Sequence, residues 1–200
     1  MLANKFGIDD AAELARLEER ISKRNALKIF TDDLLKNFPA GKFSTLAEIH
    51  RVLFSEIYDF AGKIRTVNIA KGHFRFASAL YLSEAVAHVE NMPQKNFDEI
   101  VAKYVEMNVA HPFREGNGRS TRIWLDHIFK TELQRVVDWS RVDKSEYLSA
   151  MELSPVHDAA IKKILAAALT DKINDREVFM KGIDASYFYE NYFAYRTRDL

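Results

Sequence analysis

A segment near the middle of the chain, residues 111–122, combines reactive side chains that seldom occur so close together. His111 is a candidate general base, because an imidazole accepts a proton near neutral pH. Glu115 offers a hard oxygen for Mg²⁺, which commonly arrives with nucleotide phosphates. Arg119 and Arg122 are three residues apart, hence on one face of a helix, and together they favour a polyvalent anion. These residue types predict a phosphate-transfer site.

Three residues between the glutamate and the arginines point to the same ligand. Gly116 and Gly118 let a ligand approach the main chain closely. A helix that begins near Asn117 would direct its unpaired N–H groups and its positive dipole end into the loop, an arrangement that binds phosphate. We therefore expect Gly116, Asn117 and Gly118 to line an anion hole. A simple glycine-containing turn between two helices is the alternative, but it leaves the histidine, the glutamate and the arginines unexplained.

Two core helices are expected to position this segment. Apolar residues at helical spacing lead into it and out of it: Phe97, Ile100, Val101, Tyr104 and Val105 before, and Leu125, Ile128, Phe129, Leu133 and Val136 after. Pro112 disfavours a helical conformation for the residue before it, so the first helix should end near His111. We expect Phe113 to pack into the core and fix the loop.

The segment resembles the signature of the Fic family, HPFx[D/E]GNGRxxR, and matches every fixed position. The resemblance implies an all-α fold, a Fic-type helical bundle with a small β-hairpin, the flap, beside the active site. It implies one Fic domain over residues 1–200. The expected parts are a core at about 1–170, the flap at about 64–77, the active-site loop at 111–122 and a C-terminal inhibitory helix at about 184–192.

The resemblance also implies a reaction. Fic proteins mostly transfer AMP from ATP to a Tyr, Thr or Ser hydroxyl of a target protein, so a protein adenylyltransferase is expected. His111 would deprotonate the hydroxyl, and Glu115 would hold Mg²⁺ on the α- and β-phosphates. Arg119 and Arg122 would bind the β- and γ-phosphates and stabilise the leaving pyrophosphate. Positioning and charge stabilisation should dominate such catalysis.

Residues 61–78 have the composition of a hairpin. Ile64, Thr66, Val67 and Ile69 favour a strand, Lys71-Gly72 is a turn signal, and Phe74 and Phe76 alternate with polar neighbours. By resemblance the flap would position the target through main-chain hydrogen bonds, with the turn at Lys71, Gly72, His73 and Phe74. A hairpin that only covers the core is the alternative.

Other helices are expected at about 9–29, 45–59, 81–91, 143–152, 156–169 and 175–181, with Gly182 ending the last one. The first is expected to be a charged scaffold helix. His50 lies in the pattern of the second, where a core or surface histidine is favoured over a ligand. Trp124 and Trp139 are expected to be core anchors.

A second informative stretch lies near the C-terminus. Ser186, Glu190 and Asn191 match the [S/T]xxxE[G/N] inhibitory pattern of Fic proteins, in a position similar to that of class III members. Glu190 would pair with Arg122 and repel the γ-phosphate. Tyr187 is a candidate for self-modification once this tail loosens. An amphipathic tail helix that packs on the core is the alternative.

Composition is that of an ordinary globular protein, with 48% apolar and 29% charged residues among 200. The formal net charge of zero gives no bulk attraction to nucleic acid or membrane. There are no cysteines, which agrees with a cytoplasmic location. Asp9, Asp10 and Glu13 stand where a signal peptide needs an apolar run.

The resemblance further implies partners. Class III relatives suggest a homo-oligomer that holds the inhibitory helix in place, and type II topoisomerase subunits are the expected target class. Three other functions stay open. Glu190 could activate water and remove AMP, the enzyme could transfer another phosphate-linked group such as phosphocholine, or the chain could be a non-catalytic nucleotide-binding module.

Overall fold

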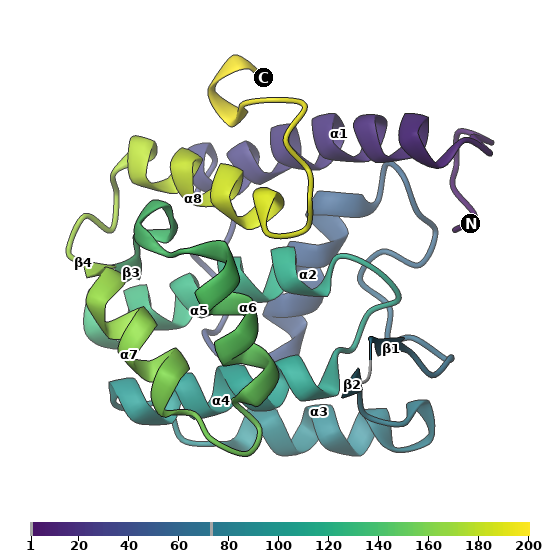
Figure 1. Cartoon of the computed structure of the whole chain (residues 1–200). Helices are drawn as coiled ribbons and strands as arrows, with labels where there is room; N and C mark the ends of the chain where they lie inside the picture. Colours follow the sequence, from purple (N-terminus) through teal and green to yellow (C-terminus); the bar gives the residue numbers. More distant parts are fainter. Residues whose placement is uncertain (1, 73) are drawn as a thin grey trace.

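Eight α-helices build the fold in a computed structural model that describes residues 2–72 and 74–200 (Figure 1). They are α1 (Ala11–Thr31), α2 (Phe43–Phe54), α3 (Leu82–Asn91), α4 (Phe97–Ala110), α5 (Asn117–Leu133), α6 (Lys144–Leu153), α7 (Ala159–Ala168) and α8 (Arg176–Phe188). Short 3₁₀ turns are η1 (Ala79–Tyr81), η2 (Trp139–Arg141) and η3 (Thr197–Asp199). The predicted all-α fold is confirmed.

Two small antiparallel strand pairs complete the structure. In the flap, β1 (Ala70–Lys71) pairs with β2 (Phe74–Arg75), with Ala70 opposite Arg75. On the far side of the molecule, β3 (Val136–Val137) pairs with β4 (Leu169–Thr170) and ties the end of α5 to the end of α7. None of the helices among the described residues combines the length and apolar character of a membrane span.

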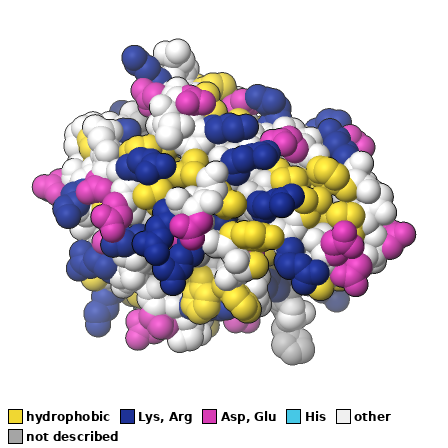
Figure 2. Space-filling model, turned by 90° about the horizontal axis from the view of Figure 1, so that it is seen from above, with side chains coloured by type: hydrophobic (Ala, Val, Ile, Leu, Met, Phe, Trp, Pro, Cys, Tyr) yellow, Lys and Arg dark blue, Asp and Glu magenta, His cyan; other side chains and the backbone are white. Residues whose placement is uncertain are grey.

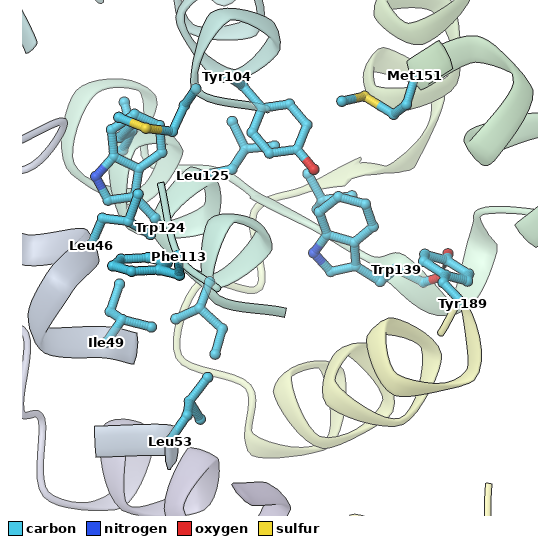
Figure 3. Close-up of a cluster of buried hydrophobic side chains, with 14 of the residues drawn as sticks. Leu46, Ile49, Leu53, Tyr104, Phe113, Trp124, Leu125, Trp139, Met151 and Tyr189 are labelled. Carbon is cyan, nitrogen blue, oxygen red and sulfur yellow. Dashed lines mark hydrogen bonds between the residues drawn. The ribbon is translucent and has the colours of Figure 1, made fainter. Parts of the chain in front are cut away.

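The hydrophobic core surrounds α5, which packs against α2, α4 and α8. Trp124 and Phe113 are fully buried beside Leu46 and Ile49 of α2, as Figure 3 shows. Trp139 is also buried, and its indole N–H donates to Asp126 at 2.8 Å. The expectation that both tryptophans and Phe113 serve as core anchors is confirmed. The core therefore fixes both ends of the 111–122 segment.

Several predicted element boundaries were wrong. The second helix ends at Phe54 instead of residue 59, because the chain turns there with Tyr58 buried in the core. The strand propensity of residues 64–69 is not realised, and the described part of the hairpin has two residue pairs. Gly182 does not end a helix. It lies inside α8, where its missing side chain allows close packing on Trp139.

The last residues of the chain fold back over α1, and we call residues 194–197 the tail clasp (Figure 1). Lys23 of α1 is 1% exposed, and its Nζ lies 2.6 Å from the carbonyl oxygen of Tyr195, 2.9 Å from Glu19 and 3.1 Å from Asp184. The Glu19 carboxylate accepts the backbone N–H groups of positions 194 and 195 at 2.9 and 3.2 Å. The clasp thus fastens the segment that follows α8.

Candidate active site

The candidate base sits at the end of α4, in a conformation unusual for its residue type. His111 has a φ of 49°, in the left-handed region, because the helix stops before Pro112. Its ring stacks on Phe76 of the flap, with centroids 3.6 Å apart. Nδ1 lies 3.2 Å from the Asn108 carbonyl oxygen. Because a carbonyl only accepts, the proton belongs on Nδ1, which leaves Nε2 as the proton acceptor.

Burial determines the protonation state of this histidine. It lowers the pKa of His111 to about 4, against a smaller raising effect of the hydrogen bond to Asn108 and of Glu190. The imidazole is therefore neutral at physiological pH and able to take a proton. This is the state that a general base requires.

Glycine and asparagine shape the loop that follows. Gly116 has a φ of 74°, and a Cβ there would overlap the Phe54 ring. The Asn117 side chain accepts from the N–H of Phe113 at 2.8 Å and donates to its carbonyl at 2.7 Å. Asn117 thus closes the loop on itself. Ser120 is the first residue of α5 whose N–H bonds back, to Gly116 at 3.1 Å, so the amides before it face the loop.

Both arginines of α5 meet one carboxylate of the tail. Glu190 places Oε1 2.8 Å from Arg122 and Oε2 3.0 Å from the Arg119 Nε. Ser186 adds its hydroxyl, which accepts from the Arg122 Nε at 2.6 Å, and its carbonyl at 2.9 Å. A Cβ at Gly118 would overlap Glu190, so this glycine makes the room that the carboxylate occupies. The predicted inhibitory residues Ser186 and Glu190 therefore lie in the predicted phosphate site.

The charges of this cluster explain its protonation. Burial raises the pKa of Glu190, but the two guanidinium groups outweigh burial and hold the pKa below its ordinary value. Glu190 is thus ionised at neutral pH. Its side chain is only 18% exposed, so the pair is shielded from water and salt. Charge-assisted hydrogen bonds of this kind are among the strong ones in proteins.

Two further carboxylates hold Arg119, and one of them was missed from the sequence. Glu18 of α1 is 2% exposed and places Oε1 2.6 Å from the Arg119 Nη1, while Tyr58 donates to the same carboxylate. Glu115 contacts Arg119 at 3.1 Å. Glu18 lies in a helix whose pattern predicts a solvated scaffold, so its sequence carries no signal for this contact.

A buried histidine of α2 supports the loop from behind. His50 places Nε2 2.8 Å from the Glu115 carbonyl oxygen, and its Nδ1 accepts the N–H of Gly62 at 2.9 Å. Its ring stacks on Phe113 with centroids 3.9 Å apart. Burial lowers its pKa to about 3, so it stays neutral. Of the two predicted alternatives, a core or a surface histidine, the structure shows the core one, and nothing in the sequence indicated its link to the active-site loop.

Comparisons with known proteins decide the family. Residues 42–129 match the model of the Fic/DOC family, a span that holds α2, the flap, α4 and the whole 111–122 segment. This span of the chain is a Fic/DOC family domain. A Bartonella schoenbuchensis relative, "Protein adenylyltransferase VbhT", is 30% identical over 75% of this chain and 33% of its own length, so the chain spans about a third of that protein. A Salmonella typhimurium relative, "Probable protein adenylyltransferase Fic", is 26% identical over 86% of this chain and 88% of its own length.

Solved Fic structures share the fold. The BepC protein of Bartonella tribocorum, solved with bound AMPPNP, superposes with a TM-score of 0.67 at 18% identity, covering 85% of this chain and 92% of that one. A Fic domain from Bartonella quintana with bound ADP gives 0.69 at 19% identity, covering 89% and 93%. At these identities the likeness concerns the fold, which agrees with the predicted Fic-type bundle.

The remaining predicted residues lie around this Fic site in different ways. Lys71 and Gly72 are exposed at the tip of the flap and Phe74 is partly buried, while His73 lies outside the described residues. Asn191 accepts from Lys144 at 2.6 Å, which fastens the end of α8. Tyr187 is fully buried, with its ring beside the Arg119 guanidinium.

The predicted metal carboxylate partly fits its role. Glu115 is 39% exposed at its side chain, and one oxygen accepts from Gly116 at 2.9 Å and meets Arg119. Among residues 2–72 and 74–200 there is no cluster of three metal-binding side chains. A single carboxylate suits Mg²⁺ that brings its other ligands from nucleotide and water. Glu115 could hold such an ion only together with a bound nucleotide.

Proposed function

We propose that the protein is a protein adenylyltransferase that transfers AMP from ATP to a hydroxyl of a target protein, and that its own α8 holds it inactive. The names of the curated relatives support the predicted enzyme class, a nucleotidyltransferase. The observation that carries the proposal is Glu190 seated on Arg119 and Arg122, beside a histidine in the state of a general base.

Each group has a part in the reaction. Nε2 of His111 takes the proton of the target hydroxyl as the hydroxyl oxygen bonds to the α-phosphorus. The bond between the α-phosphorus and the bridging oxygen then breaks, and pyrophosphate leaves. The free amides at the start of α5 and the Arg122 guanidinium stabilise the charge on the phosphates. Mg²⁺ held by Glu115 and the nucleotide would supply further charge neutralisation.

Inhibition follows from competition for one guanidinium. Arg119 keeps Glu18 and Glu115 when Glu190 leaves, whereas Arg122 loses the one carboxylate that it contacts in the described part of the chain. An anionic phosphate that reaches Arg122 must therefore displace Glu190. A nucleotide that binds without displacing it would have its α-phosphate turned away from attack.

The decisive experiment is label transfer from α-³²P-ATP with Mg²⁺ in cell lysate. Wild type, Glu190→Gly and His111→Ala in the Glu190→Gly background are compared. We expect label on the Glu190→Gly protein and on a lysate band, little with wild type, and none once His111 is replaced. Equal labelling by wild type and Glu190→Gly would contradict self-inhibition. No label with any variant, despite ATP binding, would favour AMP removal, another donor or a binding module.

Four finer expectations from the sequence stay predictions. They are a homo-oligomer that stabilises docked α8, self-modification on Tyr187, a type II topoisomerase subunit as target, and a cytoplasmic location. ATP as the donor is supported by the AMPPNP and ADP bound to the similar Fic structures.

A further inference from the structure

A buried arginine joins the flap to the candidate catalytic histidine. Arg65 is 4% exposed, and among residues 2–72 and 74–200 its side chain donates only to backbone carbonyls. Nε donates to His111 at 2.8 Å, Nη1 to Val67 at 2.7 Å, and Nη2 to Ala77 at 2.6 Å and to Ala110 at 3.1 Å. One guanidinium thus contacts the end of α4 and both ends of the flap.

The absence of a counter-ion makes this arrangement informative. Within the described residues, no carboxylate lies at ion-pair distance from Arg65. Burying a charge without a partner is costly unless hydrogen bonds satisfy it. Four carbonyls do so here. Two of them, those of Ala110 and His111, lie at the C-terminal end of α4, where the helix dipole also favours a cation. The fork of an arginine can reach in these several directions at once, and a lysine cannot.

Two neighbouring contacts fix the same relation. The N–H of Ala77 donates to Val109 of α4 at 3.0 Å, and the N–H of Arg65 donates to Pro112 at 2.8 Å. Phe76, between the two ends of the flap, stacks on the His111 ring. A shift of the flap would therefore shift the His111 ring that takes the proton. The hydrogen bond from Arg65 to the His111 carbonyl opposes such a shift.

We propose that Arg65 is a positioning residue that sets the flap in register with His111, so that a hydroxyl presented along the flap lies within reach of Nε2. Arg65 itself contacts neither nucleotide nor target in this arrangement. It acts through the left-handed conformation of His111, which is strained for a non-glycine residue. It also acts through the carbonyls of Val67 and Ala77, at the two ends of the flap. The catalytic part of this proposal rests on the proposed AMP transfer, whereas the flap clamp does not.

The test uses Arg65→Lys and Arg65→Met in the whole chain carrying Glu190→Gly. Arg75→Met is the matched control, since Arg75 is an exposed arginine on the same flap. Initial rates of labelling of the lysate band by α-³²P-ATP are measured against ATP concentration. We expect both Arg65 variants to lose at least 30-fold in maximal rate, while the half-saturating ATP concentration changes less than twofold. The Arg75 control should match its parent.

A purely structural role predicts a different pattern. It would lower the melting temperature and weaken ATP binding in parallel with the rate, and that result would overturn the proposal. An Arg65→Lys protein with the parent's rate would also overturn it, because charge alone would then suffice. If neither variant folds, the proposal can still be tested on the wild type. NMR measures the proton exchange of the Arg65 Nε–H without any substitution. We expect it to exchange at least tenfold more slowly than that of Arg75, and equal exchange would refute the clamp.

Hydrogen exchange separates this proposal from the proposed function. Amides of residues 65 and 77 should exchange at least tenfold faster in Arg65→Lys than in Arg75→Met, whether or not any AMP is transferred. Label transfer that fails in every variant, with this exchange difference present, would reject the enzymatic proposal and keep the clamp. Unchanged exchange would reject the clamp itself.

Discussion

At the scale of single residues, the proposed inhibitory contact depends on more than one carboxylate. Ser186 accepts the Arg122 Nε–H at 2.6 Å in a buried site, where water does not readily replace the lost partner. Hydrogen bonds to charged groups contribute about 1.5–3 kcal/mol, and an unsatisfied buried donor costs a similar amount. The hydroxyl should therefore contribute a measurable part of the docking free energy of α8.

We predict that Ser186→Ala raises the basal AMP transfer of the otherwise unchanged protein about tenfold, because about 1.4 kcal/mol is a factor of ten in the undocked population. The increase should stay below that of Glu190→Gly, since the salt bridges remain. Ser83→Ala, at an exposed position of α3, is the control. Labelling at the wild-type level would show that the Ser186 carbonyl alone orients Arg122.

The partly buried base makes a prediction about pH. Since burial lowers the pKa of His111 to about 4, the imidazole is unprotonated, and so able to accept a proton, throughout the range above that value. We expect the maximal rate of Glu190→Gly to be nearly flat between about pH 5.5 and about pH 8 and to fall only at lower pH. A fall with a midpoint near the ordinary histidine value of about 6.5 would mean that the ring is solvated during turnover.

At the scale of secondary-structure elements, α8 is held from both sides. Its inner face meets Arg122 of α5, and the tail clasp ties the following segment to α1 through the nearly fully buried Lys23. Removing Lys23 would leave Glu19 and Asp184 facing each other without a cation. Breaking a buried ion pair by removal of one partner typically costs about 3–5 kcal/mol.

We therefore predict that Lys23→Met releases α8. Amides of residues 186–195 should exchange faster with solvent, and basal AMP transfer should rise toward the level of Glu190→Gly. Lys181→Met is the matched control, because Lys181 is an exposed lysine of α8 whose bridge to Glu177 is screened by water. If exchange accelerates while labelling stays at the wild-type level, the clasp stabilises the fold without governing inhibition.

The sequence predicted these elements unequally, for physical reasons. Helices α4 and α5 were located because apolar periodicity and a proline define them, and the 111–122 motif located the site. The flap was overestimated because residues 64–69 have strand propensity, but Arg65 binds the carbonyls at its ends in place of a longer ladder. Glu18, His50 and Arg65 could not be assigned, since each acts through a backbone or a side chain that only the folded chain brings near.

At the scale of the whole molecule, the C-terminal segment packs on the first helix, α1, which also supplies Glu18 to the arginine cluster of the candidate site. Helix α1, α8 and the C-terminal residues form one face, which Figure 2 shows from above, with Lys and Arg side chains spread among acidic and apolar ones. Tyr187 lies beneath this face, fully buried, and this burial raises the pKa of its phenol well above the ordinary value. In the docked form its hydroxyl is inaccessible to the active site of its own or any other copy.

We expect self-modification of Tyr187 only after α8 is released. Intact-mass analysis and peptide mapping after incubation with ATP and Mg²⁺ should find an AMP adduct on the 187 peptide of Lys23→Met, and none on wild type under the same conditions. Glu190→Gly should behave like Lys23→Met to the extent that it undocks the tail. An adduct of equal yield on wild type would show that the tail opens without help.

If α8 inhibits the enzyme as proposed, the clasp also sets how the enzyme responds to its own substrate. Glu190 is tethered, so it returns to Arg122 at an effective concentration on the order of millimolar or higher, and ATP must compete with it at that level. Each additional ~1.4 kcal/mol that the clasp contributes divides the basal rate by about ten. Residues 194–197 contact α1 and Asp184 and none of the candidate catalytic or phosphate-binding residues, so we expect substitutions there to change the resting activity without altering the chemistry.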